Sequence, residues 1–231
     1  MKRQIVNALI VALFGLIFAG IAFGYEERWF LRPLAEFYVT QTPIELGLPN
    51  IVTGILITWR GFDTLGEVAV LFMVAASVGL LLGTSATPQA NAQPLPLVRS
   101  PGEVVESGAA TLLPLIFMFG AYVIANGHLS AGGGFQGGAI VASGVVLLML
   151  ARPRTSLSLG FLAITESASG VLYVALGLMG AIFAGGFLDS RFLPAGTFGA
   201  FISAGAIPVI STLLGIKVGA ELSVIVDRFR S

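Results

Sequence analysis

The chain has 231 residues, of which 56% are hydrophobic and only 10% are charged, with a mean hydropathy of +0.94. This composition excludes an ordinary water-soluble domain and predicts a polytopic membrane protein. The 12 basic and 12 acidic residues cancel, so no basic face is available for nucleic acid, and the lack of cysteine excludes disulfides and thiolate-held iron–sulfur clusters.

The first predicted span covers residues 4–24. Its apolar stretch, 5–23, is longer than the roughly 7–15 residues of a secretory signal, so we expect an uncleaved span. Residues 25–49 mix charged and aromatic side chains, which predicts an interfacial loop or a short amphipathic helix. Residues 51–59 are too few to cross a bilayer, so they are expected to lie in the interface or to re-enter.

The second predicted span, 63–83, carries Asp63 and Glu67 in its first turns. The two acids are four residues apart and therefore share one helix face. One interpretation is structural, because acids in a first turn complement the helix dipole and Asp63 would cap the helix. The other is that both supply oxygen ligands to a passing cation.

A linker is predicted after this span. Residues 84–101 are rich in Pro, Ala, Gln and Ser and show no apolar period. We therefore expect a two-span module over 1–83, a linker over 84–106 and a four-span module over 107–231, whose first span is 107–125.

Residues 126–138 read Asn-Gly-His-Leu-Ser-Ala-Gly-Gly-Gly-Phe-Gln-Gly-Gly and contain the only histidine. The apolar stretch from 137 to Ala151 would form a helix of roughly 22 Å, where the bilayer core needs about 30 Å. Part of 130–136 is then expected at membrane depth, where non-helical backbone must be packed in protein or line a wet cavity. The alternative is a flexible outer turn in which glycine allows positive φ.

The last two predicted spans contain charged residues. The apolar stretch 157–188 is longer than one crossing requires. Glu166 is therefore expected near one edge of the membrane, as either a solvated or a functional carboxylate. The sixth span, 201–226, places Lys217 near mid-bilayer, where an ammonium costs about 2.5–3.5 kcal/mol and needs a partner. Glu221, one turn on, is the nearest in sequence. A purely structural ion pair or a snorkelling lysine is the alternative.

Six spans put both termini on one side of the membrane. That side has more basic residues, so the positive-inside rule predicts cytoplasmic termini and places Asp63 and His128 outside. The cytoplasmic side would hold Lys2, Arg3, Arg99, Arg152, Arg154, Arg228 and Arg230, and the outer side Arg28, Arg32, Arg60 and Arg191.

The run GHLSAGGGFQGG, followed by an apolar helix, resembles the signature of the B subunit of multi-subunit Mrp-type cation/proton antiporters, also found in related modules of membrane-bound hydrogenases. That family commonly reads Ser-Pro-Gly where this chain has Ser130-Ala131-Gly132, and losing the proline frees φ and returns a backbone N–H. The Gly-Ile-Lys-Val-Gly around Lys217 resembles a segment of the family's last span.

A second resemblance involves the first module. Asn50-Ile-Val and the later RGFDTLGE resemble the C-terminal part of the A subunit of the same antiporters and the corresponding small subunit of membrane-bound hydrogenases. Together the resemblances imply an A-subunit tail fused to a B subunit. They also imply a protein of the prokaryotic cell membrane, embedded in the lipid bilayer. Its expected partners are Na⁺, H⁺ and other antiporter subunits, both the large proton-channel-like ones and the small membrane ones.

The resemblance and the placement of polar groups indicate a Na⁺ or H⁺ path. His128 would pass a proton near neutral pH, Lys217 would couple the two ions, and Na⁺ would bind only transiently at Asp63 and Glu67. The candidates are Asp63, Glu67, His128, Gln136, Glu166, Lys217 and Glu221, with Gly132, Gly133, Gly134, Gly137 and Gly138 shaping the loop.

Two other functions are alternatives to ion transport. The chain would be a non-conducting scaffold of the antiporter, or of a hydrogenase-type respiratory complex, if its charges are paired and static. An enzyme has little support, because the sequence shows no metal-ligand cluster, nucleophile–base–acid constellation or phosphate loop. A single histidine also excludes a bis-histidine haem, so no cofactor is expected.

Overall fold

The computed structural model describes residues 2–27, 29–83, 101–153 and 155–230. Within these ranges there is no strand, and six helices are long and apolar enough to cross a membrane. This confirms the predicted all-α membrane fold. The six are α1 (Lys2–Phe23), α4 (Gly61–Gly83), α5 (Glu103–Ala125), α6 (Gly134–Ala151), α7 (Leu159–Phe183) and α8 (Ile207–Arg230).

The chain divides into two compact units, Met1–Phe37 and Tyr38–Ser231. The first unit contains α1, an apolar helix none of whose central span is buried inside protein. Its length and apolar composition agree with the first predicted span.

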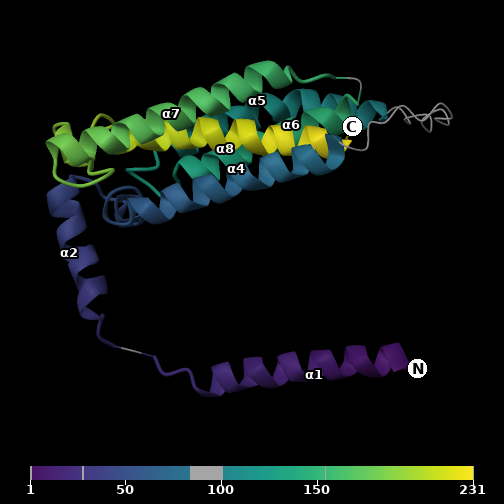
Figure 1. The fold of residues 1–231 in the computed structure, drawn as a ribbon, viewed down its shortest axis with the longest axis horizontal. Coiled ribbons are helices and arrows are strands. Elements are labelled where there is room, and N and C mark those ends of the chain that lie inside the picture. The colour runs from purple at the N-terminus through teal and green to yellow at the C-terminus, as the bar shows by residue number, and fades with distance from the viewer. Residues whose placement is uncertain (1, 28, 84–100, 154, 231) are drawn as a thin grey trace. The chain divides into compact units, whose positions relative to one another are not determined.

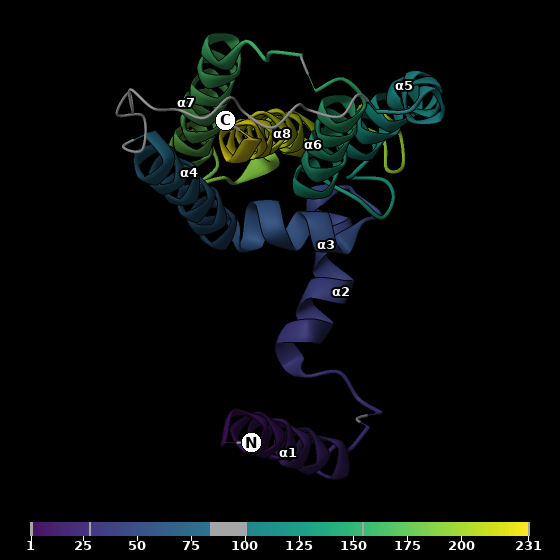
Figure 2. The ribbon, with the colours of Figure 1, turned by 90° about the vertical axis from the view of Figure 1, so that its right-hand side faces the viewer.

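Helix α8 is the centre of the second unit. It packs against α4, α5, α6 and α7, and the five helices run side by side (Figures 1 and 2). Two thirds of the α8 span is buried, 67%, against 6% of α4 and 11% of α7. The polar side chains of α8 consequently face protein on most sides, whereas the outer helices present apolar side chains outward.

Glycines let α6 approach α5 and α8 closely. A Cβ added at Gly138 would lie 2.7 Å from the carbonyl oxygen of Gly215 on α8, and one at Gly137 would clash with the side chain of Ile124 on α5. Small residues at helix interfaces allow this approach, which supplies packing where no hydrophobic effect drives association in lipid.

Short elements close one end of the bundle. The mixed stretch 25–49 contains α2 (Pro33–Leu46), and 51–59 forms α3 (Ile51–Gly54) followed by a π-helix, η1 (Ile55–Trp59). The α7–α8 loop, 184–206, contains the 3₁₀ turn η2 (Ser190–Phe192). Leu46, Leu48, Ile57, Tyr173, Leu188 and Ile210 form a buried cluster that joins these elements to α7 and α8.

Two helices begin earlier in the chain than predicted. Helix α5 begins at Glu103 rather than 107, because Glu103 and Glu106 complement the positive end of the helix dipole in its first turn. The rest of the predicted linker, 84–100, lies outside the described residues. Helix α6 begins at Gly134 rather than 137, so its 18 residues reach about 27 Å, close to a full crossing.

Two other boundaries also differ from the prediction. Helix α7 ends at Phe183 rather than 188, and α8 begins at Ile207 rather than 201. The residues between them belong to the α7–α8 loop because Leu188 and Ala204 adopt left-handed φ values of 61° and 64°, which no helix continues through.

Candidate functional site

The glycine loop, 126–133, joins α5 to α6 and is tied to α3 by side-chain hydrogen bonds. The side-chain amide of Asn50 donates to the carbonyl oxygens of Gly127 and Ser130 at 2.6 and 2.7 Å. The Thr53 hydroxyl also donates to Gly127, at 2.7 Å. The loop is therefore anchored to α3, although Gly132 and Gly133 do adopt the positive φ that the interpretation as an outer turn expected.

Two loop residues have backbone conformations that favour glycine. Gly132 and Gly133 have φ of +150° and +154°, and the ψ of Gly133 is −179°. Side chains are rare at such values because the Cβ clashes with the backbone. Gly127 needs to be glycine for another reason, since a Cβ there would lie 2.6 Å from the Cα of Gly133.

His128 joins the glycine loop to the α7–α8 loop. Its side chain is buried, and its Nε2–H donates to the carbonyl oxygen of Phe201 at 3.1 Å, which leaves Nδ1 without a partner among the described residues. Burial lowers the pKa of His128, although nearby carbonyls such as that of Ala200 partly oppose the shift. The imidazole is therefore neutral at pH 7, and the predicted titration near neutral pH moves to more acidic pH.

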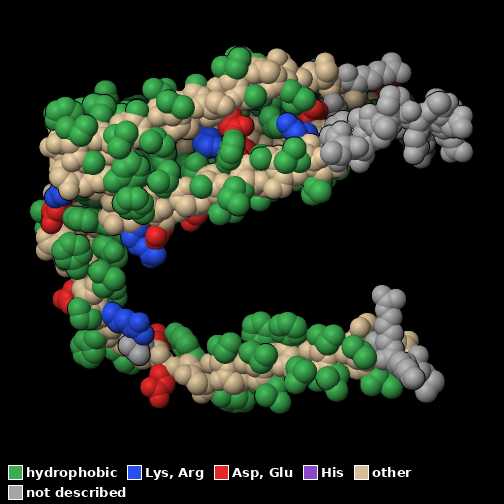
Figure 3. Space-filling view, viewed as in Figure 1, with side chains coloured by type: hydrophobic (Ala, Val, Ile, Leu, Met, Phe, Trp, Pro, Cys, Tyr) green, Lys and Arg blue, Asp and Glu red, His purple; other side chains and the backbone are tan. Residues whose placement is uncertain are grey.

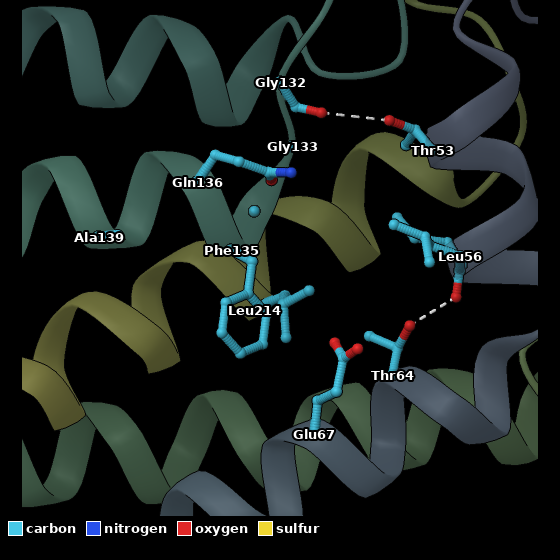
Figure 4. Close-up of a pocket in the computed structure, with 12 residues that line it drawn as sticks. Thr53, Leu56, Thr64, Glu67, Gly132, Gly133, Phe135, Gln136, Ala139 and Leu214 are labelled. Carbon is cyan, nitrogen blue, oxygen red and sulfur yellow. Dashed lines mark hydrogen bonds between the residues drawn. The ribbon is translucent and has the colours of Figure 1, made fainter. Parts of the chain in front are cut away.

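A cavity of about 530 Å³, here called the loop cavity, lies between α3, α4 and α6 (Figure 4). Glu67 of α4 and Gln136 of α6 line it from different helices, together with the backbone of Gly133. Its other lining residues are Thr53, Leu56, Ile57, Thr64, Gly132, Gly134, Phe135, Ala139 and Leu214. Glu67 remains exposed within this chain, so part of the cavity wall is left to lipid or to another subunit.

The π-helix η1 forms one wall of the loop cavity. The backbone N–H of Arg60 reaches back five residues to the carbonyl of Ile55 at 2.7 Å, and the Thr64 hydroxyl donates to the carbonyl of Leu56 at 2.6 Å. Isolated π turns occur frequently at functional sites. Sequence reasoning did not name Asn50, Thr53 and Thr64 as site residues, although Asn50 and Thr64 lie in the two stretches that carry the second resemblance.

Asp63 lies apart from this cavity. Its carboxylate pairs with Arg60, three residues earlier, and both side chains are about half exposed. The sequence prediction joined Asp63 to Glu67 because four residues separate them, but only Glu67 lines the loop cavity. An exposed pair of this kind contributes about 0–1 kcal/mol. Asp63 lies in the first turn of α4, where an acid complements the helix dipole, but two residues inside the helix rather than at its cap.

Lys217 lies in the middle of α8 and has two carboxylate neighbours. Its Nζ is 2.8 Å from Oε2 of Glu221 and 3.4 Å from Oε1 of Glu166 on α7. The Glu166 side chain is only 12% exposed. Glu166 is therefore not a solvated carboxylate at the edge of a span: it faces α8, and Gly170 one turn further on leaves room for the lysine stem, 3.5 Å from an added Cβ.

The polar groups thus fall into separate sets. Glu67 and Gln136 share the loop cavity, the Glu166–Lys217–Glu221 cluster lies between α7 and α8, and His128 and Asp63 belong to neither. Within the described ranges, no group of three or more His, Cys, Asp or Glu side chains is placed to hold a metal ion.

Residues 104–224 match the family model described as a domain related to the MnhB subunit of Na⁺/H⁺ antiporters, and residues 2–96 match the model described as the MbhE subunit of MBH. An uncharacterized protein of Methanocaldococcus jannaschii is 29% identical, covering 96% of this chain and 90% of its own length. A probable A/B subunit of a K⁺/H⁺ antiporter from Rhizobium meliloti is 28% identical over 65% of this chain, which spans only 18% of that protein.

Among solved structures, a chain of the membrane-bound sulfane sulfur reductase, an archaeal respiratory membrane complex, is 32% identical. The match covers 99% of this chain and 98% of that one, with a TM-score of 0.83. The resemblance therefore extends over both the α1–α4 and the α5–α8 segments.

Proposed function

Because the chain belongs to the family of domains related to the MnhB subunit of Na⁺/H⁺ antiporters, we propose that its loop cavity lies on a monovalent-cation path. The chain is a membrane subunit of an Mrp-type antiporter or of a related membrane-bound, hydrogenase-like complex, with the other subunits as partners. We propose a transport role for it rather than a catalytic one. We also propose that 1–83 and 107–231 are A-like and B-like modules joined by the linker.

The cavity lining carries this proposal. Sodium and potassium ions prefer oxygen ligands, and Glu67, Gln136 and the glycine backbone offer carboxylate, amide and carbonyl oxygens around one space (Figure 4). The Thr64 hydroxyl has already committed its proton to Leu56, so its oxygen presents only lone pairs. Such groups are costly in an apolar membrane segment unless a polar species uses them.

The test is cation/proton exchange by membrane vesicles that contain the assembled complex. Glu67→Gln removes one anionic ligand, which at about 1.5–3 kcal/mol corresponds to a roughly 10–100-fold higher cation concentration for half-maximal exchange. Asp63→Asn is the matched control, since it neutralises a nearby carboxylate outside the cavity. Native gels establish assembly. Normal exchange by an assembled Glu67→Gln complex would refute the cation path.

A scaffold role is the second candidate. The observation that favours it is the apolar surface of α4, of whose span only 6% is buried, which suits contact with neighbouring subunits. It predicts that Glu67→Gln leaves exchange unchanged, whereas bulky polar substitutions on α1, such as Leu13→Gln, reduce assembly.

The chain is a multi-pass prokaryotic membrane protein, and we propose that both termini are cytoplasmic. The excess of basic residues on the terminal side supports this orientation. Because the chain has no cysteine, single cysteines introduced by Thr155→Cys and Ala131→Cys report the two sides separately. A membrane-impermeant thiol reagent added outside cells should label only Ala131→Cys, and the reverse pattern would invert the topology.

A further inference from the structure

The Glu166–Lys217–Glu221 cluster contains two carboxylates and one ammonium in a buried place. The Glu221 side chain is 0% exposed, that of Lys217 is 7% exposed and that of Glu166 is 12% exposed. One oxygen of Glu221 accepts from Lys217, while the other, Oε1, has no partner among the described residues. If all three groups were ionised, one negative charge would be buried without compensation, which is strongly unfavourable.

No described side chain around the cluster supplies the missing positive charge. Helix α6 contains no titratable residue, and Arg228 lies two turns beyond Glu221, against Gly79 of α4. The remaining titratable groups on the packed helices are acids or phenols, except for the terminal Arg230. They are Asp63 and Glu67 on α4, Glu103, Glu106 and Tyr122 on α5, Tyr173 on α7, and Asp227 on α8.

A second cavity, of about 550 Å³, leads to the cluster. It lies between α4 and α7 and is lined by Glu166, Ser167, Gly170 and Lys217, with Phe72 and other apolar side chains around them. Figure 3 shows basic and acidic side chains next to each other in the middle of this face, surrounded by hydrophobic ones. Glu221 is not part of the lining and lies behind Lys217.

We propose that the Glu166–Lys217–Glu221 cluster binds one exchangeable proton, which resides on Glu221 and is exchanged through the α4–α7 cavity. The surroundings of this cluster favour a bound proton over a bound sodium ion. Only Glu166 and Ser167 add oxygen-bearing side chains to an otherwise apolar lining, and the ammonium already occupies the position between the carboxylates where a metal ion would bind.

The proton would move by a relay that conserves charge. Lys217 donates one of its three protons to the Glu166 carboxylate and takes the proton of the Glu221 carboxyl, so the ammonium is restored while Glu166 becomes neutral and Glu221 ionised. Glu166 then releases its proton to water in the cavity. The first transfer follows the 3.4 Å hydrogen bond in which Lys217 donates to Glu166. The second runs against the direction of the 2.8 Å bond, from a Glu221 carboxyl that turns its O–H toward the neutral amine. The use of this relay in ion exchange rests on the proposed transport function. The presence of a bound proton does not.

Dicyclohexylcarbodiimide tests whether the cluster holds a proton, because this reagent reacts with protonated carboxyls in apolar surroundings. The assembled complex in native membranes is treated over a range of pH and the adducts are located by mass spectrometry. We expect one adduct per chain, on Glu221 or Glu166, which disappears as pH rises. Infrared difference spectra should show one carboxylic-acid carbonyl band that Glu221→Gln removes, a readout that does not depend on access of the reagent.

Two variants distinguish a bound proton from a static ion pair. Glu166→Gln leaves a neutral Lys217–Glu221 pair, so the adduct and the band should both be lost although Glu221 remains. Lys217→Met removes the ammonium, so the protonated carboxyls should rise from one to two per chain. Absence of both adduct and band in the wild type at every pH, as expected if a partner subunit supplies a cation, would overturn the inference.

The same experiment separates this inference from the proposed cation path. Glu67→Gln should leave the adduct and the band unchanged, because Glu67 lines the other cavity. A Glu67→Gln complex that exchanges ions normally would refute the cation path and leave the proton site intact. Absence of the adduct and the band, together with impaired exchange by Glu67→Gln, would refute the proton site and leave the cation path intact.

Discussion

Asn50 should be the residue on which the shape of the glycine loop depends most. Its side-chain amide donates to two loop carbonyls, those of Gly127 and Ser130, and its oxygen caps α3 by accepting from the backbone N–H of Thr53. Asn50→Ala removes these three interactions and a fourth, from the amide to the Thr53 hydroxyl, and leaves the buried Gly127 carbonyl with one partner fewer. At about 0.5–1.5 kcal/mol for each loop bond and about 1 kcal/mol for the cap, we expect a local loss of about 2–4 kcal/mol.

Hydrogen exchange measures this loss directly. The backbone N–H groups of Leu129 and Ser130 both bond to the carbonyl of Asn126, so they exchange only when the loop opens. A loss of about 2–4 kcal/mol should speed their exchange roughly 30–1000-fold, since about 1.4 kcal/mol corresponds to a factor of ten. The loop cavity should loosen with the loop, so cation exchange by the assembled complex should also fall.

The matched control is Asn7→Ala, the same substitution at an exposed position of α1. It should leave exchange in the glycine loop unaltered. If Asn50→Ala speeds the Leu129 and Ser130 amides by less than about threefold, equivalent to well under 1 kcal/mol, the loop is held by something other than Asn50 and our account of the site is wrong.

Two further substitutions test the packing and the electrostatics. Gly138→Ala would force a methyl group against the α8 backbone and should cost about 1–3 kcal/mol, seen as a lower unfolding temperature, whereas Gly108→Ala, with open space around it, should be neutral or slightly stabilising. Burial lowers the pKa of His128, so below about pH 6.5 the unfolded chain binds more protons than the folded one and the free energy of unfolding falls as pH falls. His128→Gln should remove this part of the acid sensitivity, and unfolding curves of both proteins between about pH 8 and pH 5 that stay parallel would contradict it.

The sequence identified the polar residues of the membrane domain but not which of them meet. It predicts that Lys217 needs a partner, and Glu221 is one, because residues four apart on a helix are always neighbours. Glu166 could not be assigned to the same cluster, because its contact depends on how α7 is rotated against α8. Asp63 and Glu67 show the converse, since a shared helix face did not bring them to one cavity.

The glycine motif shows the same division. Its unusual composition marked it as a candidate site, and the family model that spans it agrees with the family resemblance that the motif carries. The side chains that hold it, Asn50 and Thr53, lie more than 70 residues earlier in the chain. Hydrogen bonds over such a separation leave no periodic trace in a sequence, so only the structure finds them.

Composition and apolar length determined that this chain enters a membrane and crosses it about six times, because transfer of apolar side chains out of water is a property of each residue and adds along a segment. The tertiary structure alone decided which polar groups share a cavity and which carboxylates meet the same ammonium group. Those interactions depend on distances of a few ångströms between helices, and close packing at glycines such as Gly138 helps to set those distances.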